Sequence, residues 1–112
     1  MNLDIEVSTA GVVVMRPAGR LDASVSAAFR QRVAETVGSR SNRIVVDLQG
    51  VTFLDSSGLG ALISALKTAR QHAGDLRIAA PNEQARVILE LTSLDKVLRP
   101  YGSVQEALAS YA

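Results

Sequence analysis

The sequence contains no cysteine and no tryptophan, and its only histidine is His72. The absence of cysteine excludes disulfides, thiolate metal sites and cysteine nucleophiles. The aspartates and glutamates are scattered over separate predicted elements, and without cysteine or histidine partners they form no metal-binding spacing. We therefore expect neither a metal nor a cofactor.

Long apolar runs, a secretion signal and clusters of basic residues are also missing. No apolar run approaches the roughly 20 residues needed to span a bilayer, and the N-terminus lacks the basic and apolar regions of a signal peptide. With 12 lysines and arginines against 11 aspartates and glutamates, the net charge of +1 does not favour binding to nucleic acid or to a membrane surface. At 112 residues, we expect one cytoplasmic domain spanning residues 1–112.

Alternation of apolar and polar residues predicts an N-terminal hairpin, and the rest of the chain alternates between helices and strands. Residues 3–7 and 12–15 form the hairpin around Ala10-Gly11, and residues 19–22 form a tight connection. Further strands are expected at 44–48, 76–80 and, as a weak strand, 97–99. Helices are expected with Asp22 or Ser24 as the N-cap, near Ser56, with Asn82 as the N-cap, and from Ser103. This order predicts an α/β domain in which an antiparallel hairpin joins a partly parallel sheet.

The segment Asp55-Ser56-Ser57-Gly58-Leu59-Gly60 is the most unusual part of the chain, because it opens an amphipathic helix with two serines and two glycines. Asp55 is predicted to be the N-cap of this helix. Glycine in a helix costs about 0.5–1 kcal/mol relative to alanine, so we hypothesise that something approaches this backbone closely. A serine hydroxyl at a helix N-terminus is also a favourable place for a phosphoryl group. A well-capped turn with no further role is the simpler alternative.

The sequence does not support an enzyme. A serine hydrolase would need a base within about 3 Å of Ser56 or Ser57, but His72 follows Ser56 by sixteen residues, which is roughly 24 Å along a continuous helix. His72 also falls on the polar face and is predicted to be a solvated helix residue. The P-loop, the dinucleotide fingerprint and the nucleophile elbow are all absent.

Three segments together resemble the STAS domain of bacterial anti-sigma-factor antagonists: Gly19-Arg20-Leu21-Asp22, the strand 44–48, and residues 54–60. The resemblance runs over nearly the whole chain and implies the STAS fold, an α/β single domain with a mixed sheet, an antiparallel N-terminal hairpin and helices packed mainly on one face. It implies that the unphosphorylated protein binds and sequesters an anti-sigma factor, a serine kinase of the histidine-kinase-like ATPase fold. This kinase would phosphorylate Ser56, and a PP2C-type phosphatase would remove the phosphate.

The same resemblance implies that the loop carrying Asp22 lies beside the Ser56 turn and shares its partner surface. The partner-binding residues that we predict are Asp22, Ala23, Asp55, Ser56, Ser57, Gly58, Leu59 and Gly60. Phosphorylation would add about −1.5 to −2 charges at the centre of this surface and weaken the complex. We expect a stand-alone protein that is a monomer when free.

Two alternatives stay open. The chain could be a ligand-binding or scaffold STAS subunit that is never phosphorylated, as part of a lipid-transport or stress-sensing complex, or a serine hydrolase whose base comes from a partner chain. The resemblance also leaves open whether the output is a sigma factor, secretion or motility, and whether Ser57 is modified too.

Overall fold

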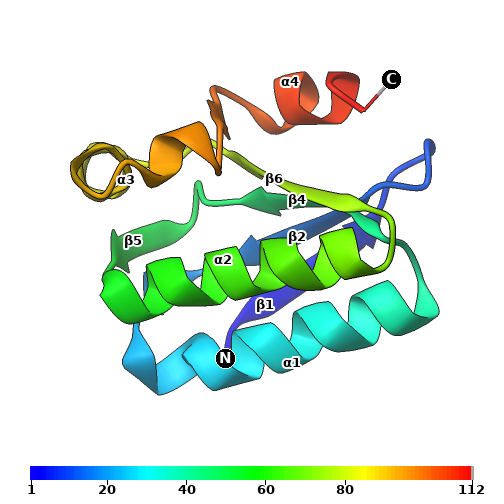
Figure 1. Ribbon diagram of the computed structural model, residues 1–112, viewed down its shortest axis with the longest axis horizontal. Coiled ribbons are helices and arrows are strands. Elements are labelled where there is room, and N and C mark those ends of the chain that lie inside the picture. Colours follow the sequence, from blue (N-terminus) through cyan, green and yellow to red (C-terminus); the bar gives the residue numbers. More distant parts are fainter. Residues whose placement is uncertain (112) are drawn as a thin grey trace.

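The computed structural model describes residues 1–111 and contains a five-stranded mixed sheet with the strand order β1-β2-β4-β6-β7 (Figure 1). The strands are β1 (Leu3–Val7), β2 (Val13–Pro17), β4 (Arg43–Asp47), β6 (Asp75–Ala79) and β7 (Pro100–Tyr101). β1 pairs with β2 in antiparallel fashion, whereas the pairs β2·β4, β4·β6 and β6·β7 are parallel. The mixed sheet with an antiparallel N-terminal hairpin is therefore confirmed.

A second, two-stranded parallel ribbon lies beside the main sheet and consists of β3 (Gly19–Leu21) and β5 (Val51–Leu54). Two predictions were wrong here. Residues 19–21 form a strand rather than part of a tight connection, and residues 51–54, where no strand was expected, form β5, which leads into the helix at Ser56. Strands of three and four residues are too short to show a clear alternation, and each depends on hydrogen bonds from a segment about thirty residues away.

Residues 1–111 contain four helices, three of which pack on the main sheet (Figure 1). α1 (Ala23–Ser39) and α2 (Ser56–Gln71) pack against each other on one face, and α4 (Val104–Ala109) lies on the other. α3 (Glu83–Leu91) packs against β5 and is followed by the short 3-10 turn η1 (Leu94–Lys96). Each helix of this part of the chain is too short or too polar to cross a membrane.

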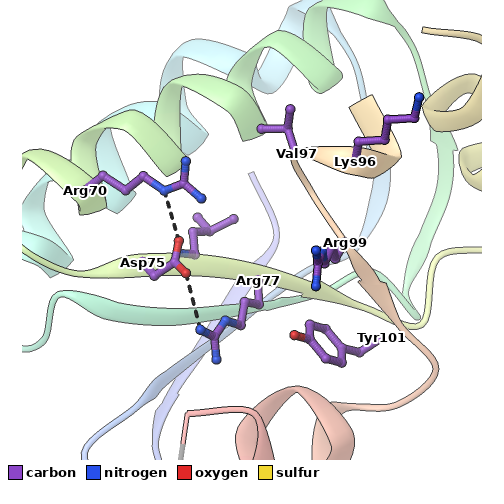
Figure 2. A pocket seen from close by; sticks show the side chains of 8 residues that line it. Arg70, Asp75, Arg77, Lys96, Val97, Arg99 and Tyr101 are labelled. Atoms are coloured by element: carbon purple, nitrogen blue, oxygen red, sulfur yellow. Dashed lines mark hydrogen bonds and ion pairs between the residues drawn. The ribbon is translucent and has the colours of Figure 1, made fainter. Parts of the chain in front are cut away.

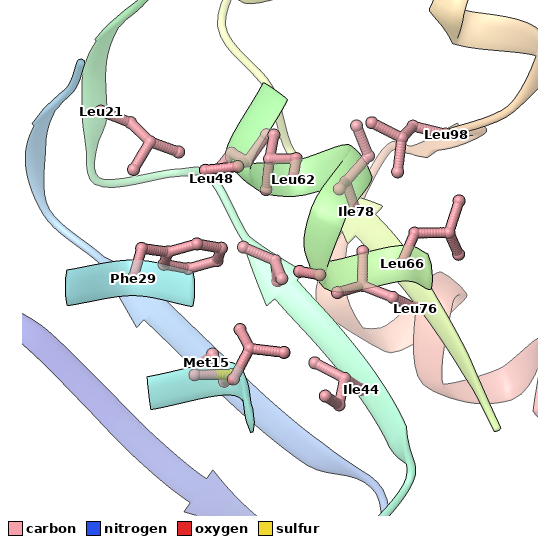
Figure 3. Close-up of a cluster of buried hydrophobic side chains, with 14 of the residues drawn as sticks. Met15, Leu21, Phe29, Ile44, Leu48, Leu62, Leu66, Leu76, Ile78 and Leu98 are labelled. Carbon is pink, nitrogen blue, oxygen red and sulfur yellow. The ribbon is translucent and has the colours of Figure 1, made fainter. Parts of the chain in front are cut away.

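The main core lies between the sheet and the pair α1 and α2. Its fully buried side chains include Met15, Phe29, Ile44, Leu62 and Ile78 (Figure 3). A smaller cluster of Val12, Val14, Val45, Ala79 and Ala107 packs between the opposite face and α4. The β4 strand contributes to both clusters, which explains its continuous apolar run.

The C-terminal part differs from the prediction at one element. We expected a strand at 97–99, but the structure has η1 followed by the two-residue strand β7. Only Leu98 of the expected strand is buried, at 1% exposure, while Val97 is 45% exposed. A single buried residue in an otherwise exposed segment carries too little pattern to distinguish a strand from a turn.

Candidate functional site

The exposed Ser56 lies at the first position of α2, immediately after β5. Asp55 has an extended backbone and caps the helix, because its Oδ1 accepts a hydrogen bond from the backbone N–H of Gly58 at 2.8 Å. The predicted cap is therefore confirmed. The cap uses one of the unpaired N–H groups of the first turn and leaves the Ser56 hydroxyl at the positive end of a sixteen-residue helix.

The start of α1 lies next to the start of α2. β3 and β5 run parallel with Leu21 opposite Leu54, so the residues that follow them, Asp22 and Asp55, emerge at the same end of the ribbon. Asp22 caps α1 and accepts hydrogen bonds from the Ser24 backbone N–H at 3.0 Å and from the Ser24 hydroxyl at 2.6 Å. The hydroxyl is the main cause that holds the pKa of Asp22 below its usual value. The predicted proximity of the Asp22 loop and the Ser56 turn is confirmed.

Gly58 is needed by the protein's own packing. A Cβ atom at this position would overlap the carbonyl oxygen of Leu21, and it would lie 2.8 Å from the Leu21 carbonyl carbon and 2.9 Å from Leu54 Cδ1. Our hypothesis that the bare backbone admits an outside molecule is therefore wrong for Gly58, since β3 itself fills the space. At Gly60, a Cβ would meet only Arg30 Nη2, at an ordinary 3.6 Å.

The predicted partner surface divides into an exposed part and a buried part. Ala23 and Ser56 are exposed, and Asp22, Asp55, Ser57 and Gly60 are partly exposed. Gly58 and Leu59 are buried, with Leu59 only 3% exposed, because Leu59 starts the apolar stripe of α2 that faces the core. These two residues support the surface from below and offer no side chain to a partner.

The sequence did not reveal that α3 fixes β5. The Gln84 side chain pairs with the Leu54 backbone: its Oε1 accepts from the N–H at 2.9 Å, and its Nε2 donates to the carbonyl at 2.7 Å. Asn82, predicted as the cap of α3, accepts from the Ala85 N–H and also donates to the carbonyl of Val51. The Gln84 side chain thus makes the two hydrogen bonds that a neighbouring strand would make to Leu54, the residue directly before Asp55.

A stacked pair on the ribbon was also missed. The Arg20 guanidinium lies 4.4 Å from the centre of the Phe53 ring, and these residues are register partners on β3 and β5. Arg20 Nε also lies 3.3 Å from Asp22 Oδ2, although the Arg20 side chain is 63% exposed. The pair therefore places a cation and an aromatic ring next to the N-cap of α1.

The remaining chemistry of the chain is remote from Ser56. His72 is the C-cap of α2, so it lies at the opposite end of the helix, and its Nδ1 lies 3.0 Å from the Thr68 carbonyl oxygen. A Ser56–His72 pair within one chain is therefore not formed. Residues 1–111 contain no group of three histidines, cysteines, aspartates or glutamates that could hold a metal ion.

Comparisons with known proteins agree with this architecture. A family model described as the STAS domain matches residues 4–107. An anti-sigma F factor antagonist of Paenibacillus polymyxa is 32% identical over 110 residues, which cover 96% of this chain and 94% of that protein. An anti-sigma factor antagonist of Mycobacterium paratuberculosis, solved by crystallography, has a TM-score of 0.85 at 28% identity and covers 97% of this chain and 92% of its own.

The fold is also that of SpoIIAA. Its unphosphorylated form has a TM-score of 0.82 at 21% identity, with 98% of this chain and 96% of that chain covered. The phosphorylated form from Bacillus has a TM-score of 0.75 at 20% identity, with 99% of this chain and 100% of that chain covered. At this level of identity, the likeness shows a common fold.

Proposed function

The chain belongs to the STAS domain family, and we propose that it is an anti-sigma-factor antagonist whose binding to an anti-sigma factor is switched by phosphorylation of Ser56. The names of the P. polymyxa and M. paratuberculosis relatives support the antagonist role. The observation that carries the site assignment is the exposed Ser56 hydroxyl at the start of α2, beside the N-terminus of α1.

In the unphosphorylated state, the surface around Ser56 suits a closely docked protein. Its exposed residues Ala23 and Ser56 have small side chains, and the buried Gly58 packs closely on Leu21 of β3. Asp22 and Asp55 are each engaged in capping a helix, so their carboxylates are partly neutralised by backbone N–H groups. A partner that meets this surface therefore faces few groups that are costly to desolvate.

The kinase would transfer the γ-phosphoryl group of ATP to Ser56 Oγ, with ADP as the leaving group and the hydroxyl proton lost to a base of the kinase. The phosphoserine would carry about −1.5 to −2 charges. It would stand beside the carboxylates of Asp55 and Asp22, so the modified surface would become strongly anionic. A loss of about 3 kcal/mol in binding free energy weakens a complex by roughly a hundredfold, which is enough to release the partner.

The reverse step would be hydrolysis of the phosphoserine by water, which releases inorganic phosphate and restores the hydroxyl. We assign this step to a PP2C-type phosphatase, and the forward step to an anti-sigma factor kinase of the histidine-kinase-like ATPase fold. Exposure of Ser56 is required for both, because either enzyme must bring its reacting groups to Oγ.

The test is a kinase assay on matched serine variants. The chain is incubated with ATP and an anti-sigma factor kinase, and its intact mass is measured for wild type, Ser56→Ala and Ser57→Ala. We expect one phosphate on wild type and on Ser57→Ala and none on Ser56→Ala. Phosphate on Ser56→Ala would contradict the site. A kinase that binds the chain tightly but never modifies it would instead favour the scaffold subunit.

A further inference from the structure

A cationic cavity of about 320 Å³ lies at the end of α2 that is remote from Ser56 (Figure 2). Its walls come from the last turn of α2, from β6 and from the segment that runs from the end of η1 into β7. Four of the lining residues are cationic, namely Arg70, Arg77, Lys96 and Arg99, and Asp75 is the one carboxylate among them. The side chains that line the cavity therefore carry an excess of three positive charges.

Asp75 neutralises only part of this charge. Its Oδ1 lies 3.3 Å from Arg70 Nε, and its Oδ2 lies 3.4 Å from Arg77 Nη2. Lys96 and Arg99 make no ion pair with any residue in the range 1–111 that the structure describes. Because a guanidinium has five N–H donors and an ammonium has three, most of the donors around the cavity remain available to a ligand.

The concave shape of the cavity strengthens the positive electrostatic potential that these side chains produce. Cations that line a concave surface reinforce one another's field and raise the local concentration of anions. The cavity volume of about 320 Å³ is near the lower end of the ~300–1,000 Å³ typical of small-molecule sites, so the occupant should be small. Tyr101 and the 45% exposed Val97 add an apolar strip to an otherwise charged wall.

We infer that this cavity binds a small phosphorylated compound with at least two negative charges. Guanidinium groups match the oxygens of a phosphate bidentately, and an ammonium adds a mobile point charge. The two arginines held by Asp75 are preorganised, whereas Lys96 and Arg99 supply the charges that have no partner within residues 1–111. The site is separate from the proposed switch, because Arg70 follows Ser56 by fourteen residues of α2, or roughly 21 Å along the helix.

The test variants avoid residues that hold the fold. Arg77 is unsuitable, because its Nη1 donates to Ser110 Oγ at 2.7 Å and its guanidinium stacks on Tyr111 at 3.9 Å. Lys96 and Arg99 are exposed, so the double variant Lys96→Gln/Arg99→Gln should fold normally. The matched control is Lys67→Gln/Arg86→Gln, which removes the same charge from exposed positions on α2 and α3 outside the cavity.

The experiment is a titration of each protein with pyrophosphate and with phenyl phosphate at constant ionic strength, followed by backbone amide NMR shifts. We expect saturable shifts in residues 75–77 and 96–101 of wild type, binding at least tenfold weaker in the cavity variant, and a change below about twofold in the control variant. Equal weakening in both variants would overturn the proposal, because it would indicate diffuse attraction. The proposal would also be overturned if no shift saturates below about 10 mM, or if acetate binds as well as the phosphates.

Discussion

Replacing Gly58 by alanine tests the packing that positions the proposed switch. In an unobstructed helix, a glycine-to-alanine change stabilises by about 0.5–1 kcal/mol. At Gly58, however, the new methyl group would overlap the Leu21 carbonyl and lie 2.9 Å from Leu54 Cδ1. An added methyl group that clashes with backbone atoms, which cannot change rotamer as a side chain can, typically lowers the stability by about 1–3 kcal/mol and sometimes more. We therefore expect Gly58→Ala to destabilise the protein by about 2 kcal/mol.

The matched control is Gly60→Ala, two residues further along the same helix. Its methyl group would meet only Arg30 Nη2 at 3.6 Å, so the full helix-propensity gain of about 0.5–1 kcal/mol should appear. Chemical denaturation gives both free energies of unfolding, and the thermal midpoint should fall by about 8 °C for Gly58→Ala and rise by about 2–4 °C for Gly60→Ala. Two variants that both stabilise would refute the claim that β3 packs on Gly58.

Three further predictions concern contacts around the ribbon, the helix cap and the C-terminus. Gln84→Ala should cost about 1–3 kcal/mol in unfolding free energy, because it leaves the N–H and carbonyl of Leu54 unpaired; a change below the error of urea denaturation would contradict this. Asp55→Ala should cost about 1 kcal/mol through loss of the cap, while Asp55→Asn should retain most of it, and equal losses in the two variants would argue against the cap. Burial raises the pKa of Tyr111 to about 12, so folded-state stability should be fully retained below pH 10 and should fall as the pH rises from 10 to 12. The decline should amount to about 1–2 kcal/mol after allowance for the partly exposed ring, and a Tyr111→Phe variant with the same pH dependence as wild type would refute the assignment.

The parts of the fold that were predictable are those with a local signal. The alternation in residues 3–7 and the apolar run at 44–48 indicated strands, and Asp55 and Asn82 were identified as caps, because these patterns depend on neighbouring residues only. The ribbon of β3 and β5 was not predicted. Its hydrogen bonds join segments about thirty residues apart, and neither strand is long enough to show its own periodicity.

The candidate site was predicted in outline, but its construction was not. Ser56 and Asp22 were named from their resemblance to a family pattern, and the register of Leu21 with Leu54 explains why they lie together. The role of Gly58 could not be read from sequence, because a glycine that admits a ligand and a glycine that admits its own chain look identical. Gln84 carried no local signal, since its partner Leu54 lies thirty residues before it.

The ribbon gives the proposed switch a defined position. β5 leads directly into Asp55 and Ser56. It pairs with β3, and the backbone of its last residue, Leu54, is also hydrogen-bonded by the Gln84 side chain. The backbone at the start of α2 is therefore fixed from two sides. A phosphoryl group on Ser56 would change the charge of a surface whose shape is held constant, so we attribute the switch to electrostatics and desolvation rather than to refolding.

The most direct test of the central claim is the affinity of an anti-sigma factor for this chain before and after stoichiometric phosphorylation, measured by calorimetry on wild type and on Ser56→Ala. We expect wild type to lose about a hundredfold or more in affinity on treatment with kinase and ATP, while Ser56→Ala binds equally well before and after treatment. If the phosphorylated wild type binds as tightly as the untreated protein, Ser56 is not the switch.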